Sequence, residues 1–173
     1  KCCSVVSSTF SAKGSNEQKL SMLTLLAARG ATFQESFKGG HNLLSLALTE
    51  SLGAELFEFL ASKVAPETLK ASARGEKLIH LAAAKKSDIF LKILFKLAPH
   101  SPDEVNERNS QGLAPLHIAA SANCRDACMF LLSNGADPNL KTKFDDRPSQ
   151  RARGFPELAN ELRQFEADES ICC

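Results

Sequence analysis

The sequence predicts an all-α fold, a solenoid of stacked helix-turn-helix units joined by hairpin loops. A short motif recurs along the chain at intervals close to 33 residues. Each copy is followed by a second apolar segment of helical length. The best copy then stops at Gly135, a residue that can take the left-handed conformation required just after a helix. Units of this kind bury no complete core alone, so their repetition implies a stacked array.

The copies keep one register through the C-terminal half of the chain. Pro115 and Pro148 are 33 residues apart (148 − 115), and Asn106 and Asn139 are separated by the same interval. Several independent matches at one period favour an array over a chance resemblance between segments.

Two weaker copies precede the best one at slightly longer intervals. His80 lies 37 residues before His117 (117 − 80), and the copy at Gly40 lies 35 residues before the copy at Gly75 (75 − 40). Intervals above 33 indicate insertions, which repeats accept in loops rather than in helices.

The best copy reads Gly-Leu-Ala-Pro-Leu-His-Ile-Ala-Ala over 112–120 and Leu-Leu-Ser-Asn-Gly-Ala-Asp-Pro-Asn over 131–139. It resembles the ankyrin repeat, whose Thr-Pro-Leu-His-x-Ala signature recurs about every 33 residues. The resemblance implies a concave face of hairpin tips and first helices that binds other proteins. It also implies that His80 and His117 tie the start of a helix to the neighbouring loop by hydrogen bonds.

The predicted organisation follows these registers. The segments are an N-terminal lead at 1–13, a degenerate first repeat at 14–39, a second repeat at 40–74, a third repeat with a lengthened loop at 75–108, the best-matching repeat at 109–141, a capping repeat at 142–167 and a tail at 168–173.

In the N-terminal half, residues 17–29 are predicted to form the second helix of the first unit. Segments 43–51 and 54–63 form the next pair. Pro66 then opens a short helical turn within the loop at 65–71, because proline is tolerated in the first turn of a helix.

The central pair is predicted at 78–86 and 88–97, with Ser87 as N-cap. Two prolines in the loop at 98–103 prevent the second of these helices from continuing. The best pair is predicted at 113–121 and 125–134.

The segment 142–167 is predicted to close the array. Ser149 and Gln150 stand where the motif has leucine and histidine. We interpret them as the polar outer face that a terminal repeat needs, because nothing stacks on it.

Composition sets limits on function. The 173 residues include 43% hydrophobic and 24% charged residues, as in an ordinary soluble domain, and the net charge is +1. This balance gives no overall attraction to nucleic acid or to an anionic membrane. No apolar run approaches the roughly 18 residues of a membrane helix. The chain starts at Lys1 rather than methionine, so we expect a piece of a larger protein.

The cysteines indicate a reducing compartment. Cys124 and Cys128 are four residues apart on one predicted helix, a spacing that does not suit a disulfide, and are interpreted as small buried residues. Cysteine pairs also stand at both ends of the chain. A lipidated terminal pair is an alternative only if Cys173 is the true C-terminus.

No catalytic, metal or cofactor site is predicted. His80 and His117 occupy equivalent positions in successive repeats, so periodicity rather than an assembled site explains them. The sequence lacks a nucleophile motif, a phosphate-binding glycine loop and a metal-ligand pattern. We therefore expect a protein that is not an enzyme and carries no cofactor and no metal.

The predicted partner-binding residues lie on hairpin tips and on the exposed sides of first helices. The tip candidates are Lys38, His41, Arg74, Glu76, Lys77, Arg108, Asn109, Gln111, Lys143, Asp145 and Arg147. The first-helix candidates are Thr49, Lys85, Lys86, Ser121 and Asn123. Because the chain has no Trp or Tyr, contacts must depend on Arg, Phe and hydrogen bonding, which favours a polar or charged peptide.

Residues 141–153 hold five basic side chains broken by Asp145 and Asp146, and only Phe144 could stack on a base. We interpret this cluster as a solvated hairpin and cap, with a docking site for an acidic partner segment as the alternative, and we expect no nucleic-acid binding. Asn139 ends a stretch similar to the ankyrin hairpin sequence that asparaginyl hydroxylases accept. It is a candidate site of modification, the alternative being that Asn139 only stabilises the hairpin.

The expected function is non-catalytic binding of a protein or peptide partner by a monomer without a membrane segment. The alternative is a targeting or regulatory segment of a multidomain enzyme or of a bacterial effector that acts in host cells. A third hypothesis is a purely structural spacer. The expected location is the cytoplasm, with the nucleus, or the host cytosol for an effector, as alternatives.

Overall fold

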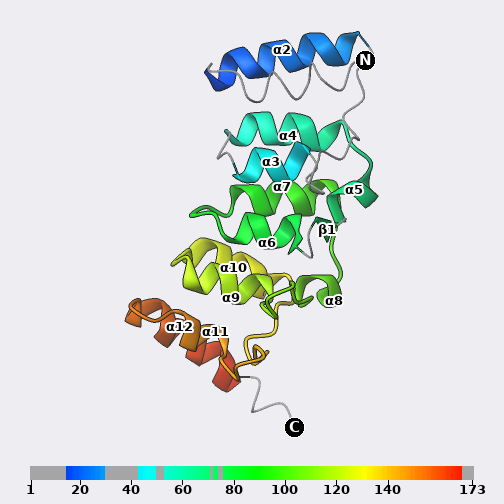
Figure 1. Ribbon diagram of the computed structural model, residues 1–173. Coiled ribbons are helices and arrows are strands. Elements are labelled where there is room, and N and C mark those ends of the chain that lie inside the picture. The colour runs from blue at the N-terminus through cyan, green and yellow to red at the C-terminus, as the bar shows by residue number, and fades with distance from the viewer. Residues whose placement is uncertain (1–14, 30–42, 50–52, 71, 74–75, 169–173) are drawn as a thin grey trace.

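Pairs of helices stack on one another along a single direction from the N-terminal to the C-terminal end (Figure 1). The computed structural model describes residues 15–29, 43–49, 53–70, 72–73 and 76–168. The pairs are α3 (Leu43–Thr49) with α4 (Ala54–Ser62), α6 (Leu78–Ala83) with α7 (Ile89–Leu97), α9 (Pro115–Ser121) with α10 (Arg125–Ser133), and α11 (Pro148–Arg151) with α12 (Pro156–Asp168). The predicted all-α solenoid is confirmed.

Helix α2 (Asn16–Ala28) lies above α4 at the N-terminal end (Figure 1). It corresponds to the helix predicted over 17–29 as the second helix of the first unit. The lead at 1–13 lies outside the described residues, as do most of the first repeat's loop and the tail. The division of the chain into repeats at the residues given above stays a prediction.

The described loops contain little regular structure other than two short helices and one small hairpin. Helix α5 (Pro66–Lys70) is the helical turn predicted at Pro66. Strands β1 (Ser72–Ala73) and β2 (Glu76–Lys77) pair in antiparallel register, with Ser72 opposite Lys77. This two-residue ladder is the start of a hairpin and leaves the fold class unchanged.

The first helices of successive pairs approach one another through alanine. Helix α6 contacts α9 and α3, and Ala82, Ala83, Ala119 and Ala120 are completely buried. Small side chains at these positions allow the helix axes to come close.

The second helices pack through aromatic side chains instead. The ring of Phe57 in α4 meets the ring of Phe90 in α7 edge-on, with 5.3 Å between the centroids. Phe95 of α7 meets Phe130 of α10 in the same way at 5.2 Å. Such contacts are favourable beyond the area they bury, so they hold the pairs in a fixed order.

The lengthened loop after α7 contains a helix that was not expected. Helix α7 ends at Leu97, but α8 (Pro102–Val105) begins a few residues later. The Ser101 hydroxyl accepts a hydrogen bond from the Glu104 N–H (3.3 Å), and the Glu104 carboxylate accepts one from the Ser101 N–H (2.8 Å). Pro102 opens α8, because its missing N–H is not needed in a first turn.

Two details of the predicted helices are wrong. The N-cap of α7 is Asp88, and Ser87 lies one residue earlier, with its hydroxyl accepting from the Ile89 N–H (3.3 Å). Ser149 in α11 is not on an outer face: it is only 3% exposed, since α12 and α9 both pack against α11. Gln150, the other residue of that prediction, is exposed, so the outer-face prediction is wrong for Ser149 alone.

Candidate interaction surface

Asn109 organises the hairpin before α9. Its backbone N–H donates to the Leu113 carbonyl (2.9 Å), and its carbonyl accepts from the Gly112 N–H (2.8 Å). The side-chain oxygen Oδ1 accepts from the backbone N–H groups of Gln111 and Leu113, both at 3.0 Å. The turn also requires a positive φ of 80° at Gly112, a conformation that glycine adopts without strain.

Thr142 organises the next hairpin in the same way. Its N–H donates to the Asp146 carbonyl (2.9 Å), and its carbonyl accepts from the Asp145 N–H (3.0 Å). The hydroxyl Oγ1 accepts from the N–H groups of Phe144 (3.1 Å) and Asp146 (3.3 Å). Asp145 takes the positive φ, at 64°. Both hairpin tips are thus held by side-chain to backbone hydrogen bonds.

A third contact holds the base of each hairpin against the helix that follows. Nδ1 of His80 accepts from the Lys77 N–H, and Nδ1 of His117 accepts from the Ala114 N–H, both at 3.3 Å. Gln150 Oε1 accepts from the Arg147 N–H at 2.8 Å. Gln150 therefore accepts the same backbone hydrogen bond as the histidine at the equivalent position of the other units.

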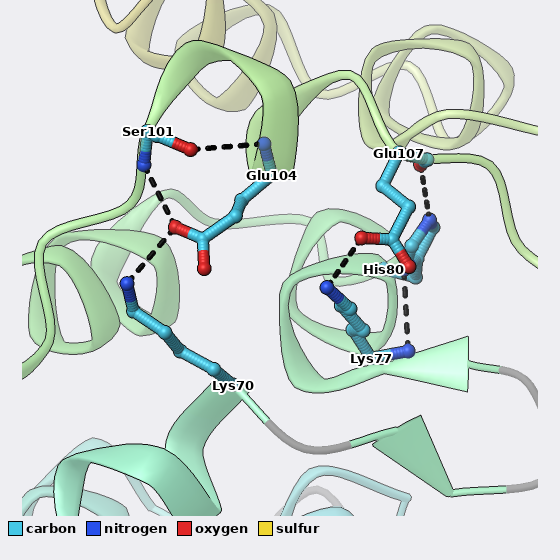
Figure 2. Close-up of polar contacts among 6 residues, drawn as sticks. All are labelled: Lys70, Lys77, His80, Ser101, Glu104 and Glu107. Atoms are coloured by element: carbon cyan, nitrogen blue, oxygen red, sulfur yellow. Dashed lines mark hydrogen bonds and ion pairs between the residues drawn. The ribbon is translucent and has the colours of Figure 1, made fainter.

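The predicted link from histidine to the neighbouring loop is confirmed for His80. Its Nε2 is 2.9 Å from the carbonyl oxygen of Glu107 in the next hairpin (Figure 2). The Nε2 of His117 has no hydrogen-bond partner in the described part of the chain. Burial lowers the pKa of both imidazoles, so both rings are neutral at pH 7.

Lys70 and Lys77 both form ion pairs with carboxylates of the α8 region (Figure 2). Lys77 forms an ion pair with the Glu107 carboxylate, and Lys70 pairs with Glu104 at 2.9 Å. The hydrogen bond from Lys70, helped by the Ser101 N–H, lowers the pKa of Glu104 to about 2. These contacts join the α5–β2 segment to the α8 loop and leave little free charge there.

Most of the basic cluster at 141–153 is also neutralised. Lys141 pairs with Asp145 (2.9 Å), while Arg151 and Arg153 both approach Asp146 (3.7 and 3.2 Å). Arg147 faces Glu166 of α12 at 3.6 Å. This pattern favours the interpretation of a solvated hairpin and cap for these four cations.

Two tip cations differ from the rest. Arg108 and Lys143 are exposed, and neither forms an ion pair with any described residue. The Lys143 side chain lies across the preceding hairpin: its Cε is 3.0 Å from the point where a Cβ on Gly112 would stand. Phe144 beside it is 74% exposed. We call Arg108, Gln111, Lys143 and Phe144 the tip cluster.

The other predicted binding residues fall into three groups. Lys86, Ser121 and Asn123 are exposed near the ends of α6 and α9, and Asn123 has a positive φ of 55°. Lys85 is half-buried and already in contact with another residue. The positions outside the description are Lys38, His41 and Arg74, together with the side chain of Thr49.

Asn109 does not suit the predicted binding role. Its side chain is 7% exposed, and besides bonding to its own hairpin it donates to the Glu76 carboxylate (3.2 Å). Phe144, by contrast, was considered only as a base-stacking ring. The sequence could have indicated Phe144 as a binding residue, because it follows Lys143 at the predicted tip of a hairpin.

Asn139 is half-buried and in contact with another residue. Its backbone N–H donates to Asp137 Oδ1 at 2.7 Å. That bond uses the side chain of Asp137 and not of Asn139, so both the modification of Asn139 and its side-chain role in the hairpin stay predictions.

The side chains of the described residues also bear on metal binding and on thiol chemistry. Within that part of the chain, no group of three or more His, Cys, Asp or Glu side chains could hold a metal ion. Cys124 and Cys128 are free and buried, and burial raises the pKa of the Cys128 thiol to about 12. A protonated, enclosed thiol is a packing residue rather than a nucleophile. Among the described helices, none is both long enough and apolar enough to cross a bilayer.

Comparison with known proteins identifies similar segments. The family model for ankyrin repeats (3 copies) matches residues 44–142. The mouse B-cell lymphoma 3 protein homolog is 36% identical over 63 residues, which is 36% of this chain and 14% of that protein. Human oxysterol-binding protein-related protein 1 is 39% identical over 79 residues, or 46% of this chain and 8% of that protein.

A third relative is an ankyrin and IPT/TIG repeat-containing protein of Schizosaccharomyces pombe, 32% identical over 85 residues. That match covers 47% of this chain and 7% of that protein. The chain thus matches only a small part of each of these longer relatives.

Proposed function

Because this chain belongs to the ankyrin repeat family, we propose that it is a non-catalytic module that binds a partner protein or peptide through its hairpin tips and first helices. Ankyrin repeats are in general protein-protein interaction modules. The observation that supports this role most directly is the pair of rigid hairpins that present the tip cluster. Side chains on a backbone already held by hydrogen bonds lose little further freedom on binding.

The stacking of helix pairs limits where a partner can bind. The faces of α6, α9 and α11 that contact each other are buried by neighbouring units, so a partner reaches hairpin tips, exposed ends of first helices and outer helices. Of these surfaces, the tips carry the unpaired cations Arg108 and Lys143. We therefore place the partner along the tip edge and extend its contacts to Lys86, Ser121 and Asn123.

A second candidate is a targeting or regulatory segment within a larger enzyme or effector. The matched relatives are much longer than the segments they share with this chain, which favours a module that works in the context of other domains. We propose the cytoplasm or the nucleus as its place of action, and a monomer as its working form.

The test is affinity capture from cytosol with the unmodified chain and two charge-reversed variants. The tip variant is Arg108→Glu with Lys143→Glu. The control is Lys92→Glu with Lys96→Glu on the outer surface of α7, where the two lysines are 58% and 71% exposed and only form exposed ion pairs. Both variants change the charge equally and should alter stability by only about 0.5 kcal/mol per site.

We expect specific partners that the tip variant loses and the control retains. Capture of no partner by the unmodified chain would favour a structural spacer. Loss of capture in the control alone would place binding on the outer helices and contradict the assignment to the tips.

A further inference from the structure

We propose that the tip cluster recognises an acidic linear segment that carries an apolar side chain, with the apolar group on the ring of Phe144 and flanking carboxylates on Arg108 and Lys143. This inference rests on the proposed binding function and narrows it to one class of partner and one place on the surface.

The apolar part of the argument is the exposure of Phe144. Its ring is 74% exposed, whereas Phe57 packs edge-on against Phe90 and Phe95 packs edge-on against Phe130. The backbone that carries the ring is fixed by the hydrogen bond from the Phe144 N–H to the Thr142 hydroxyl (3.1 Å). An aromatic ring on a hydrogen-bonded backbone gives a large contact area with few side-chain torsions to order on binding, and aromatic side chains are frequent in binding hot spots.

The net charge around the Phe144 ring determines which kind of segment can bind there. Each nearby carboxylate is already occupied: Asp145 by Lys141, Asp146 by Arg151 and Arg153, and Glu107 by Lys77. Arg108 and Lys143 have no such partner among the described residues. The uncompensated charge at the tip is therefore positive, and guanidinium and ammonium groups form their strongest hydrogen bonds with carboxylates.

The two unpaired cations are also placed to act together. The Lys143 side chain lies over Gly112 in the hairpin that holds Arg108, with its Cγ and Cε 3.2 and 3.0 Å from the position a Cβ would take there. The aliphatic part of Lys143 thus lies against the preceding tip, while Phe144 is the next residue along its own hairpin. A segment that crosses both tips would meet an apolar contact and two positive charges.

A nucleic acid suits this surface less well. Binding through phosphates needs a row of cations that displace counterions, and the affinity depends on how many are engaged. The tip has two unpaired cations, and the carboxylates of Asp145 and Glu107 lie in the same hairpins, exposed by 79% and 48%. Two cations release few counterions, so phosphate contacts alone would bind weakly, whereas a short peptide can add an apolar contact with Phe144.

The experiment is selection of short random peptides displayed on phage against the unmodified chain, with depletion on a Phe144→Ala chain. We expect the selected peptides to be rich in Asp and Glu around one Leu, Ile, Met or Phe. Selected peptides that are neutral or basic, or the absence of any peptide that distinguishes the two chains, would overturn the proposal.

The best selected peptide then serves as a labelled probe for fluorescence anisotropy. We expect Phe144→Ala to weaken its binding about tenfold or more and Phe144→Leu, which keeps an apolar side chain, to weaken it much less. Arg108→Gln with Lys143→Gln should weaken binding and remove most of its dependence on salt, whereas Lys92→Gln with Lys96→Gln should change neither. Equal binding to all variants would contradict the site.

Two further outcomes distinguish this inference from nucleic-acid binding and from the general binding function. A single-stranded oligouridylate that binds more tightly than the peptide, and does so through Phe144, would assign the tip to nucleic acid instead. If Phe144→Ala and the double Gln variant still capture the partners found in cytosol, the binding function stands and the acidic-segment inference fails.

Discussion

Asn109 and Thr142 are 33 residues apart and make the same contacts with the backbone of their hairpins. The side-chain oxygen of each accepts hydrogen bonds from the N–H groups two and four residues later. Their backbone N–H and carbonyl groups also bond to equivalent positions. Two side chains of different chemistry and length thus build the same turn, because each brings an accepting oxygen within reach of the same two N–H groups.

Asn109→Ala should destabilise the protein, although Asn109 was predicted as a binding residue. Its removal leaves two hairpin N–H groups and the Glu76 carboxylate without their partner, at a cost of about 1–3 kcal/mol. Gln111→Ala, two residues later on the exposed tip, should change stability by less than about 0.5 kcal/mol. The free energy of unfolding in urea measures both. Similar losses in the two variants would show that the hairpin does not depend on the Asn109 side chain.

The histidines predict how stability depends on pH. Burial is the largest cause of the lowered pKa of His80, and the pKa of His100 and His117 are lowered for the same reason. A group whose pKa is lower in the folded state binds more protons when unfolded. Its stabilising contribution is therefore complete above the unfolded pKa of 6.5 and is lost as the pH falls below that value.

His80→Gln tests this directly, because Gln150 shows that a glutamine oxygen can accept the same backbone N–H. The variant should be less stable at about pH 7.5, since the contact with the Glu107 carbonyl is lost. It should also lose less stability than the unmodified chain between about pH 7.5 and pH 5. Thermal unfolding at a series of pH values gives the comparison. Parallel curves would mean that His80 contributes nothing to the pH dependence.

The lowered pKa of Glu104 predicts a second decrease in the stability of the fold, at lower pH than the decrease caused by the histidines. Its pKa is lowered to about 2, first by the hydrogen bond from Lys70 and then by the Ser101 N–H, so its contribution is present above 4.5 and is lost as the pH falls toward 2. Glu104→Gln should reduce stability at neutral pH, because Lys70 loses its anionic partner. The difference from the unmodified chain should shrink below pH 4.5. Asp103→Asn, the neighbouring exposed carboxylate in α8, is the control and should show no such convergence.

The sequence was sufficient for the fold class and for most helices, because the motif combines proline, alanine and glycine at positions where the backbone requires them. Pro115 opens α9 in its first turn, and Gly135 follows the last turn of α10 with a φ of 88°. Helix α8 could also have been predicted. Ser101 and Glu104 are spaced as in a capping box with Pro102 at the first helical position, a pattern visible without a structure.

The surface was less predictable because it depends on pairs of residues that are distant in sequence. Lys70 and Glu104 are 34 residues apart, and Arg147 meets Glu166 only because α12 folds back on the last hairpin. Which tip cations remain unpaired is decided by these contacts and not by the motif. For the same reason Ser149, a polar residue in a terminal repeat, was placed outside although α12 covers it.

Gly135 and Gly154 provide a matched test of the repeat geometry. Both have positive φ values, 88° and 92°, so alanine at either position suffers a backbone strain of about 1–2 kcal/mol. The two sites differ in the room available for a Cβ atom. A Cβ at Gly135 would lie 3.2 Å from Cβ and 3.3 Å from Cγ of Pro102, whereas nothing stands within 4 Å of a Cβ at Gly154.

Gly135→Ala should therefore destabilise the protein more than Gly154→Ala, by an additional amount of about 1–3 kcal/mol, because the proline ring that opens α8 cannot rotate away. The additional cost should decrease but not disappear when Pro102→Ala is combined with Gly135→Ala, since the ring atom Cγ is then absent whereas Cβ, at 3.2 Å, remains. Chemical unfolding of the four chains, with the Pro102→Ala chain as reference for the double variant, measures these differences. Equal losses at the two glycines would mean that the α8 loop does not pack against the end of α10, and the contact from Asn106 to the Gly135 carbonyl (2.8 Å) would then also be dispensable.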